Sequence, residues 1–287
     1  MAKSRILIGS DFSSYSCTAL KVGHLWAQKL QAEAHALHIN NSKDSTDALG
    51  HLSESEGVAV KGLLSGLGNS LDEKLKKQIE GLNLKSGTIK RHIHFGKKTE
   101  ALKSKVLELN AKVLVLGSLG QGGFEDIFLG GTTERAIRSV PCPLLAVRDE
   151  RALAPKKVLW ATDLTEDSEF VFEWVKIIAE MFHPEITLLS ICDDPLRNPK
   201  SLSKLESYRD QLRQFGIQVE SSLMPMHQSS VEKALEIQIQ QADHDLIIMG
   251  TQAKTGWRRF LLGSVAEYLT HHIRRSFFIV KHPDQKK

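Results

Sequence analysis

The sequence repeats itself in two stretches, Ser4-Arg-Ile-Leu-Ile-Gly-Ser-Asp11-Phe-Ser13 and Lys156-Lys-Val-Leu-Trp-Ala-Thr-Asp163-Leu-Thr165. In both, a short apolar run leads to a small or hydroxyl residue, an aspartate, an apolar residue and a second hydroxyl residue. Further along the chain, Val113-Leu-Val-Leu-Gly117 matches Leu246-Ile-Ile-Met-Gly250. One match could arise by chance, but matches that recur in the same order indicate an internal duplication.

The duplication divides the 287-residue chain into two domains, which suits its length. We expect the first domain at residues 1–148 and the second at residues 156–287. Residues 149–155 between them form a charged stretch that ends in proline, and we interpret this stretch as a linker. The first copy is longer around Asn41 to Gly68, which is rich in Ser, Gly, Asp and His and predicts a surface connection with an extended helix.

Each copy alternates short apolar runs with longer amphipathic patterns, which is typical of a doubly wound α/β domain with a parallel sheet. The first and fourth runs are continuously apolar, as expected for strands that helices cover on both faces. The sequence therefore predicts two tandem five-stranded parallel sheets. The expected strands are about Ser4–Gly9, Ala34–Asn40, Thr88–His94, Lys112–Gly117 and Pro143–Arg148, and then Lys157–Thr162, Glu185–Cys192, Val219–Met226, Asp245–Gly250 and Ser276–Lys281.

The composition is that of a soluble globular protein, with 41% hydrophobic and 25% charged residues. The formal charge of +4 is too small to require nucleic acid or a membrane as a partner. The three cysteines, Cys17, Cys142 and Cys192, are far apart and form no C-x-x-C pair, which fits a reducing compartment. The apolar run near the N-terminus is too short for a signal peptide, so we expect a cytoplasmic protein.

Ligands of such sheets bind beyond the carboxyl ends of the strands, where two features of each copy should meet. One is the aspartate after the first strand, Asp11 or Asp163, which can accept hydrogen bonds from an amino group or a ribose hydroxyl. The other is a glycine-rich segment after the fourth strand, whose N–H groups and following helix N-terminus suit phosphate. The alternative is that these glycines only form turns and close contacts. The candidate residues of this segment are Gly117, Gly120, Gly130, Gly131 and Thr132 in the first copy, and Gly250, Gly263 and Ser264 in the second.

The spacing of these residues resembles the universal stress protein family, whose nucleotide-binding members carry G-x2-G-x9-G-[S/T] after the fourth strand. The first copy reads Gly117-x2-Gly120-x9-Gly130 but has Gly131 where Ser or Thr is expected. The second copy has Ala253 in place of the second glycine and keeps Gly263-Ser264. A methyl group at Ala253 would narrow the phosphate path, so we expect the first copy to be the better site.

The resemblance implies a fold similar to adenine nucleotide alpha hydrolases and a stress-response protein that binds ATP or AMP, with or without Mg²⁺. It also implies that the two domains pack as an internal pseudo-dimer. Two tandem chains could further associate as a homodimer, and the protein partners are unknown. Two alternatives stay open: a nucleotide-free dimeric scaffold that binds partner proteins, and a very slow ATPase. The sequence has no P-loop and no locatable catalytic constellation, so we assign no catalytic residue.

Histidines are the remaining candidates for metal chemistry. His92 and His94 lie on one face of an expected strand, and His271-His272 lie near a helix end. No carboxylate or cysteine accompanies them at ligand spacing, so we expect no metal site and interpret them as solvated side chains at the rim of the sheet.

Overall fold

The computed structural model describes the chain in a set of segments that cover most of both copies. No helix within them combines the length and apolar character that a membrane span requires. The described residues are 3–41, 54–84, 88–118, 131–165, 167–192, 199–225, 230–251, 265, 268–269 and 272–281, with the backbone alone at 54–62.

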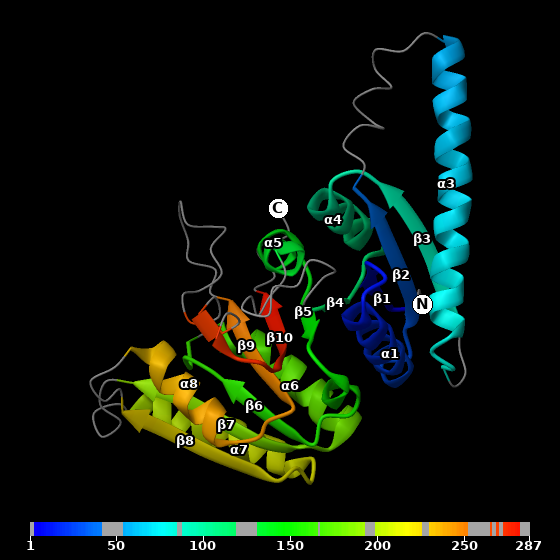
Figure 1. Ribbon diagram of the computed structural model, residues 1–287. Coiled ribbons are helices and arrows are strands. Elements are labelled where there is room, and N and C mark those ends of the chain that lie inside the picture. Colours follow the sequence, from blue (N-terminus) through cyan, green and yellow to red (C-terminus); the bar gives the residue numbers. More distant parts are fainter. Residues whose placement is uncertain are drawn as a thin grey trace.

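Ten strands form one continuous sheet in the order β3-β2-β1-β4-β5-β10-β9-β6-β7-β8 (Figure 1). Strands within each half run parallel, whereas β5 and β10 pair antiparallel where the halves meet. The predicted doubly wound α/β fold is therefore confirmed, but the two five-stranded parallel sheets that we expected are joined by the β5–β10 pair into one sheet. Every expected strand is present, with its ends shifted by at most one residue. The strands are β1 (Arg5–Ser10), β2 (Glu33–Asn40), β3 (Ile89–Phe95), β4 (Val113–Gly117), β5 (Leu144–Val147), β6 (Lys157–Ala161), β7 (Glu185–Cys192), β8 (Val219–Pro225), β9 (Leu246–Thr251) and β10 (Ser276–Lys281).

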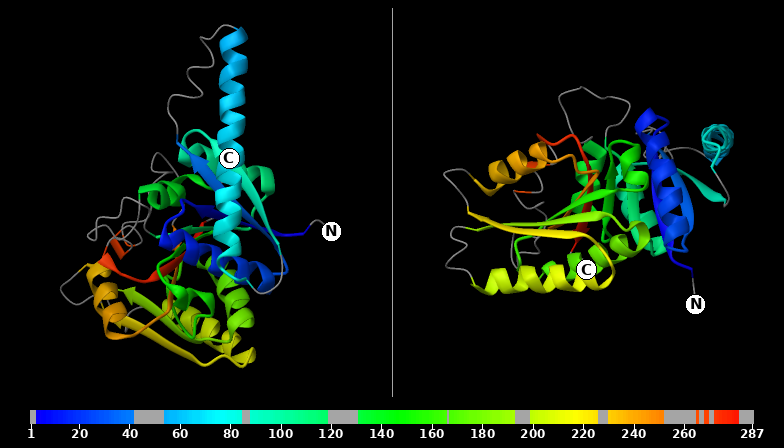
Figure 2. Two further views of the ribbon diagram at one scale, coloured as in Figure 1. Left: turned by 45° about the vertical axis from the view of Figure 1, so that its right-hand side comes forward. Right: turned by 90° about the horizontal axis from the view of Figure 1, so that it is seen from below.

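Helices cover both faces of the sheet, and each face has a hydrophobic core that extends through both halves. In the right-hand view of Figure 2, the strands of the second half lie between helices on either side. One core includes residues of α1 (Ser14–Lys29), α3 (Glu54–Glu80), α6 (Ser168–Phe182) and α7 (Pro199–Gln214). The other includes residues of α4 (Lys98–Leu109), α5 (Gly131–Ser139) and α8 (Val231–Gln241).

The stretch that we predicted as a linker is folded against the first half of the chain. It contains a 3₁₀ turn, η2 (Glu150–Leu153), in which Ala152 is fully buried. The indole Nε1 of the buried Trp26 in α1 donates a hydrogen bond of 2.9 Å to the carbonyl oxygen of Ala152. The connection between the halves is therefore held in place, while its assignment as a domain boundary stays a prediction.

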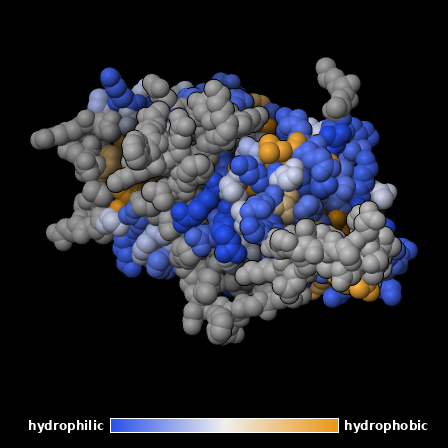
Figure 3. Space-filling view, turned by 90° about the horizontal axis from the view of Figure 1, so that it is seen from above, coloured by the Kyte–Doolittle hydropathy of each residue, from blue (hydrophilic) through white to orange (hydrophobic). Residues whose placement is uncertain are grey.

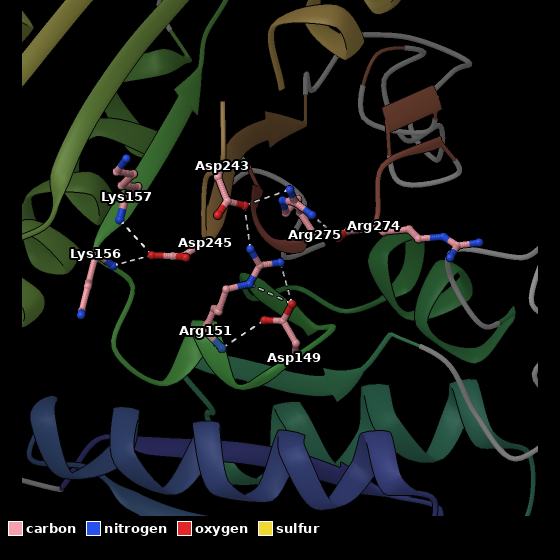
Figure 4. Close-up of polar contacts among 8 residues, drawn as sticks. All are labelled: Asp149, Arg151, Lys156, Lys157, Asp243, Asp245, Arg274 and Arg275. Atoms are coloured by element: carbon pink, nitrogen blue, oxygen red, sulfur yellow. Dashed lines mark hydrogen bonds and ion pairs between the residues drawn. The ribbon is translucent and has the colours of Figure 1, made fainter. Parts of the chain in front are cut away.

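A cluster of ion pairs joins this connection to the second half (Figure 4). Arg151 lies between Asp149 and Asp243, at 2.8 and 2.9 Å, and Arg275 reaches Asp243 at 3.1 Å. The Asp243 side chain is largely exposed, so water screens its pairs with Arg151 and Arg275, and each of these two pairs contributes little to stability. The cluster orients the connection, and the buried contacts of Trp26 supply more of its stability.

Helix α3 accounts for the extra length of the first copy. Its C-terminal half packs on the sheet, where Leu75 is buried, and its N-terminal half extends beyond the sheet (Figure 1). On the extended part, the Leu63 side chain is 74% exposed. The prediction of an extended helix is confirmed, and residues 42–53 of the expected surface connection lie outside the described residues.

A pair of histidines links β2 to β3 on the first half of the sheet. Nδ1 of the buried His35 lies 2.9 Å from Nε2 of the half-buried His92, so one imidazole donates and the other accepts. Burial lowers the pKa of both histidines below the usual value. The interpretation of His92 as a solvated side chain at the rim was therefore wrong, because β2 and α4 supply neighbours that the sequence pattern alone does not reveal.

This histidine pair predicts a loss of stability in acid. Since the folded protein holds these protons less tightly than the unfolded chain, unfolding takes up protons below about pH 6.5, and the free energy of unfolding falls with the pH. We expect His92→Gln to flatten this decline between about pH 7 and about pH 5, measured by urea unfolding at each pH. The control is His183→Asn, at a left-handed helix end that asparagine tolerates. An unchanged pH profile in His92→Gln would contradict the assignment.

Candidate functional site

Asp11 follows β1 and is fixed by the turn that begins α1. Its Oδ1 accepts hydrogen bonds from the backbone N–H of Ser13 at 3.0 Å and from the Ser13 hydroxyl at 2.5 Å. Ser13 is in turn the N-cap of α1, where its side chain accepts from the N–H of Ser16. The half-buried carboxylate is therefore held at the carboxyl end of β1, beside a helix N-terminus.

The second half builds the same turn after β6. Oδ1 of Asp163 accepts from the N–H and the hydroxyl of Thr165, at 3.1 and 2.8 Å. Phe12 and Leu164, the residues after each aspartate, both have a positive φ, 63° and 57°, which is strained for a residue with a side chain. Because both halves keep this conformation, the turn that fixes the carboxylate is a common feature of the two copies. Asp163 differs from Asp11 in being exposed.

Residues that the sequence did not single out contact the neighbours of Asp11 in the first half. The ring of His38, near the end of β2, packs against Phe12 in a tilted arrangement with 4.2 Å between centroids, and its Nδ1 lies 2.9 Å from the Ser10 carbonyl oxygen. Burial lowers the pKa of His38, so its neutral form donates to that oxygen. Lys74 of α3 lies 4.3 Å from the centroid of the Phe12 ring. No sequence motif could reveal these contacts, because they depend on where α3 docks.

The glycine that ends β4 is needed for packing. A Cβ at Gly117 would lie 2.9 Å from the backbone carbon of Tyr15 in α1, which is closer than real Cβ contacts. In the second half, a Cβ at Gly250 would lie 2.9 Å from a methyl group of Val171. Close helix–strand contact is therefore enough to explain why both positions are glycine. That their N–H groups also bind a ligand stays a prediction.

Helix α5 begins beside the end of β4. The hydroxyl of Thr133 donates a hydrogen bond of 3.0 Å to the carbonyl oxygen of Gly117, which joins the first turn of α5 to this strand. Gly131 is the first residue of α5, and Thr132 follows it. Since β1 and β4 are neighbouring parallel strands, Asp11 and the N-terminus of α5 flank the same edge of the sheet.

Asp163 and Gly250 are likewise at the ends of neighbouring strands, β6 and β9. The other candidates, Gly120, Gly130, Gly263 and Ser264, lie outside the described residues. Across the described segments, no group of three or more His, Cys, Asp or Glu residues could hold a metal ion.

Two buried hydroxyls at this edge were missed by the sequence analysis. Ser118 follows β4 and Thr251 ends β9, and they are only 2% and 6% exposed. The side-chain oxygen of each has no hydrogen-bond partner within the described part of the chain. Buried hydroxyls without a hydrogen-bond partner are rare, so each of these two indicates a place where a hydrogen-bonding partner is to be expected.

The comparisons with known proteins agree with this fold. The universal stress protein family matches residues 3–148 and again residues 155–281. A universal stress protein of Methanocaldococcus jannaschii is 28% identical over 144 residues, which are 50% of this chain and 81% of that protein. The crystal structure of a universal stress protein from Archaeoglobus fulgidus covers 98% of this chain and 99% of its own, with 16% identity and a TM-score of 0.72.

A second structure of a universal stress protein from Archaeoglobus fulgidus is a complex with dAMP; it covers 44% of this chain and 97% of its own, with 15% identity and a TM-score of 0.36. The family match includes nearly all of both halves, and each half contains the aspartate turn and the strand order described above. The chain belongs to the universal stress protein family, with two copies of the family's domain in tandem.

Proposed function

We propose that this protein is a cytoplasmic stress-response regulator that binds AMP or ATP in its first half, at the carboxyl ends of β1 and β4. The observation that carries the proposal is the juxtaposition of the Asp11 carboxylate with the N-terminus of α5 on adjacent strands. A carboxylate accepts hydrogen bonds from the adenine amino group or a ribose hydroxyl. A helix N-terminus preceded by glycines suits the phosphates.

The described residues at this edge of the sheet can each be assigned to one part of a nucleotide. Asp11 would orient the base or sugar, and the N–H groups of Gly131 and Thr132 would face a phosphate. The buried, unpaired Ser118 hydroxyl at the same edge supports a polar ligand there. Mg²⁺, where present, would neutralise charge on the phosphates of bound ATP.

The first half is the better candidate for three reasons. It keeps the second glycine of the motif, which is Ala253 in the second half. Its aspartate is half-buried, whereas Asp163 is exposed. Finally, His38 and Lys74 contact the ring of Phe12, the residue next to Asp11, and lower exposure to water strengthens hydrogen bonds.

A nucleotide-free scaffold is the second candidate. The antiparallel pairing of β5 with β10 supports an internal pseudo-dimer, since it joins the two halves through their last strands. A scaffold would bind partners through an exposed apolar surface. On the face shown in Figure 3, the described residues are mostly hydrophilic with isolated hydrophobic ones, which gives this candidate less support. The very slow ATPase remains a further alternative.

The test compares two matched variants. Asparagine keeps an acceptor at Oδ1 for the turn, but it replaces the other carboxylate oxygen with an amide that donates. We therefore expect Asp11→Asn to weaken binding of AMP, dAMP or ATP by about tenfold to a hundredfold, and Asp163→Asn to leave it nearly unchanged. The measurement is the thermal shift of each purified protein with and without nucleotide. At 100 times its Kd, a ligand should add about 2.7 kcal/mol to the wild type.

The outcomes separate the candidates. Absence of a thermal shift in the wild type, together with absence of adenine nucleotide in an extract of the denatured protein, would overturn the proposal and favour the scaffold. Steady release of phosphate from ATP that Asp11→Asn abolishes would favour the slow ATPase.

A further inference from the structure

The first half contains a cation and a hydroxyl side by side at the end of β4 and β5. The backbone N–H of Ser118 donates a hydrogen bond of 2.8 Å to the carbonyl oxygen of Val147, which continues the pairing of these strands. Arg148 is the next residue after Val147, so Ser118 and Arg148 are cross-strand neighbours just beyond the sheet.

The guanidinium of Arg148 lies at the corner that Gly117 and α1 form. Its Cζ is 5.5 Å from the centroid of the Tyr15 ring. The backbone of the same Tyr15 lies so close to Gly117 that a Cβ there would clash with it. This cation–π contact holds the arginine near the carboxyl edge of the sheet.

Both side chains have buried polar atoms without a partner. Nη1 of Arg148 and Oγ of Ser118 are inaccessible to water and form no hydrogen bond with any described residue. Within the described segments, no carboxylate forms an ion pair with Arg148. Leaving a buried donor unpaired is unfavourable, and a guanidinium is the side chain best suited to an oxyanion.

We propose that Arg148 and Ser118 bind a phosphate group of the nucleotide, opposite the N-terminus of α5. This inference rests on the proposed function, because it names a subsite of the same ligand. The hydrogen bond from Thr133 to Gly117 brings the first turn of α5 to the end of β4, next to Ser118. Helix N–H groups, a hydroxyl and a guanidinium are all donors that suit an oxyanion.

The second half provides an internal comparison. Thr251 and Lys281 are paired across β9 and β10 at the corresponding positions, and the Thr251 hydroxyl also has no described partner. However, Lys281 is buried, and its Nζ donates a hydrogen bond of 2.7 Å to the carbonyl oxygen of Val140, the residue that follows α5 in the other half. Burial lowers the pKa of Lys281 to about 8. This cation is already engaged, so the second half lacks the phosphate contact that the first half offers.

The experiment measures binding of AMP and of adenosine by calorimetry, since the two ligands differ in the phosphate. Arg148→Gln should weaken AMP binding about tenfold to a hundredfold and leave adenosine binding within about twofold of the wild type. Arg148→Lys keeps the charge but loses the paired donors and should give an intermediate loss. Lys281→Gln is the matched control, and its AMP affinity should equal that of the wild type.

Each outcome decides the question. Equal losses for AMP and adenosine in Arg148→Gln, or no loss for either, would overturn the phosphate subsite while leaving nucleotide binding intact. If the wild type binds neither ligand, the proposed function itself fails. If Arg148→Gln does not fold, as judged by its unfolding midpoint, the comparison rests on Arg148→Lys, where unchanged selectivity for AMP over adenosine would contradict the inference.

Discussion

Replacing Trp26 with alanine is expected to lower the free energy of unfolding by about 3–5 kcal/mol. The Trp26 side chain is fully buried and lies 5.5 Å from the ring of Phe182 and 5.6 Å from that of Phe278, both in the second half. Its indole also holds the connection through Ala152. Alanine would leave a cavity between the halves and an unpaired carbonyl oxygen. Urea unfolding followed by far-ultraviolet circular dichroism measures the loss.

Two controls separate packing from hydrogen bonding at this position. Trp26→Phe keeps an aromatic ring but removes the donor to Ala152, and should cost about 1–3 kcal/mol. Leu107→Ala, at a side chain that is 57% exposed, should change stability by less than about 0.5 kcal/mol. A loss in Trp26→Ala no larger than that of Leu107→Ala would show that the halves do not depend on this contact.

The second large effect concerns Gly117. We expect Gly117→Ala to reduce the free energy of unfolding by about 1–3 kcal/mol, because the new methyl group would meet the backbone of Tyr15 at 2.9 Å and α1 would have to move. A shift of α1 also displaces the turn that holds Asp11, so nucleotide affinity should fall together with stability. Chemical unfolding and a nucleotide titration of the same preparation measure both effects.

Gly66→Ala is the matched control for this substitution. A Cβ at Gly66, within α3, would meet nothing within 4 Å, so alanine should stabilise the helix by about 0.5–1 kcal/mol. If Gly117→Ala gave a similar gain, the close contact between α1 and β4 would be absent.

The strands could be predicted from the sequence because each buried parallel strand has neighbours on both faces and must be apolar throughout. β4 and β9 are examples, with four consecutive buried residues each. The positions of the Asp11 and Asp163 turns could also be predicted, because the same order of residues recurs at the ends of both strands. Their hydrogen bonds to Ser13 and Thr165 follow from side chains only two residues away.

Contacts between residues far apart in the chain could not be predicted in the same way. The bond of Trp26 to Ala152, the pairing of His35 with His92, and the burial of Lys281 against Val140 all depend on how elements pack. A single sequence contains no periodicity that reports such pairs. For the same reason, the difference between Arg148 and Lys281, which are equivalent cations at the end of the last strand of each half, becomes visible only in three dimensions.

The most direct test of nucleotide binding in the first half is a crystal structure of the full chain grown with millimolar ATP and Mg²⁺. We expect one nucleotide per chain, with its base or ribose at Asp11 and its phosphates between α5 and Arg148. Electron density for the nucleotide only beside Asp163, or a first-half site filled by the protein's own side chains, would contradict it.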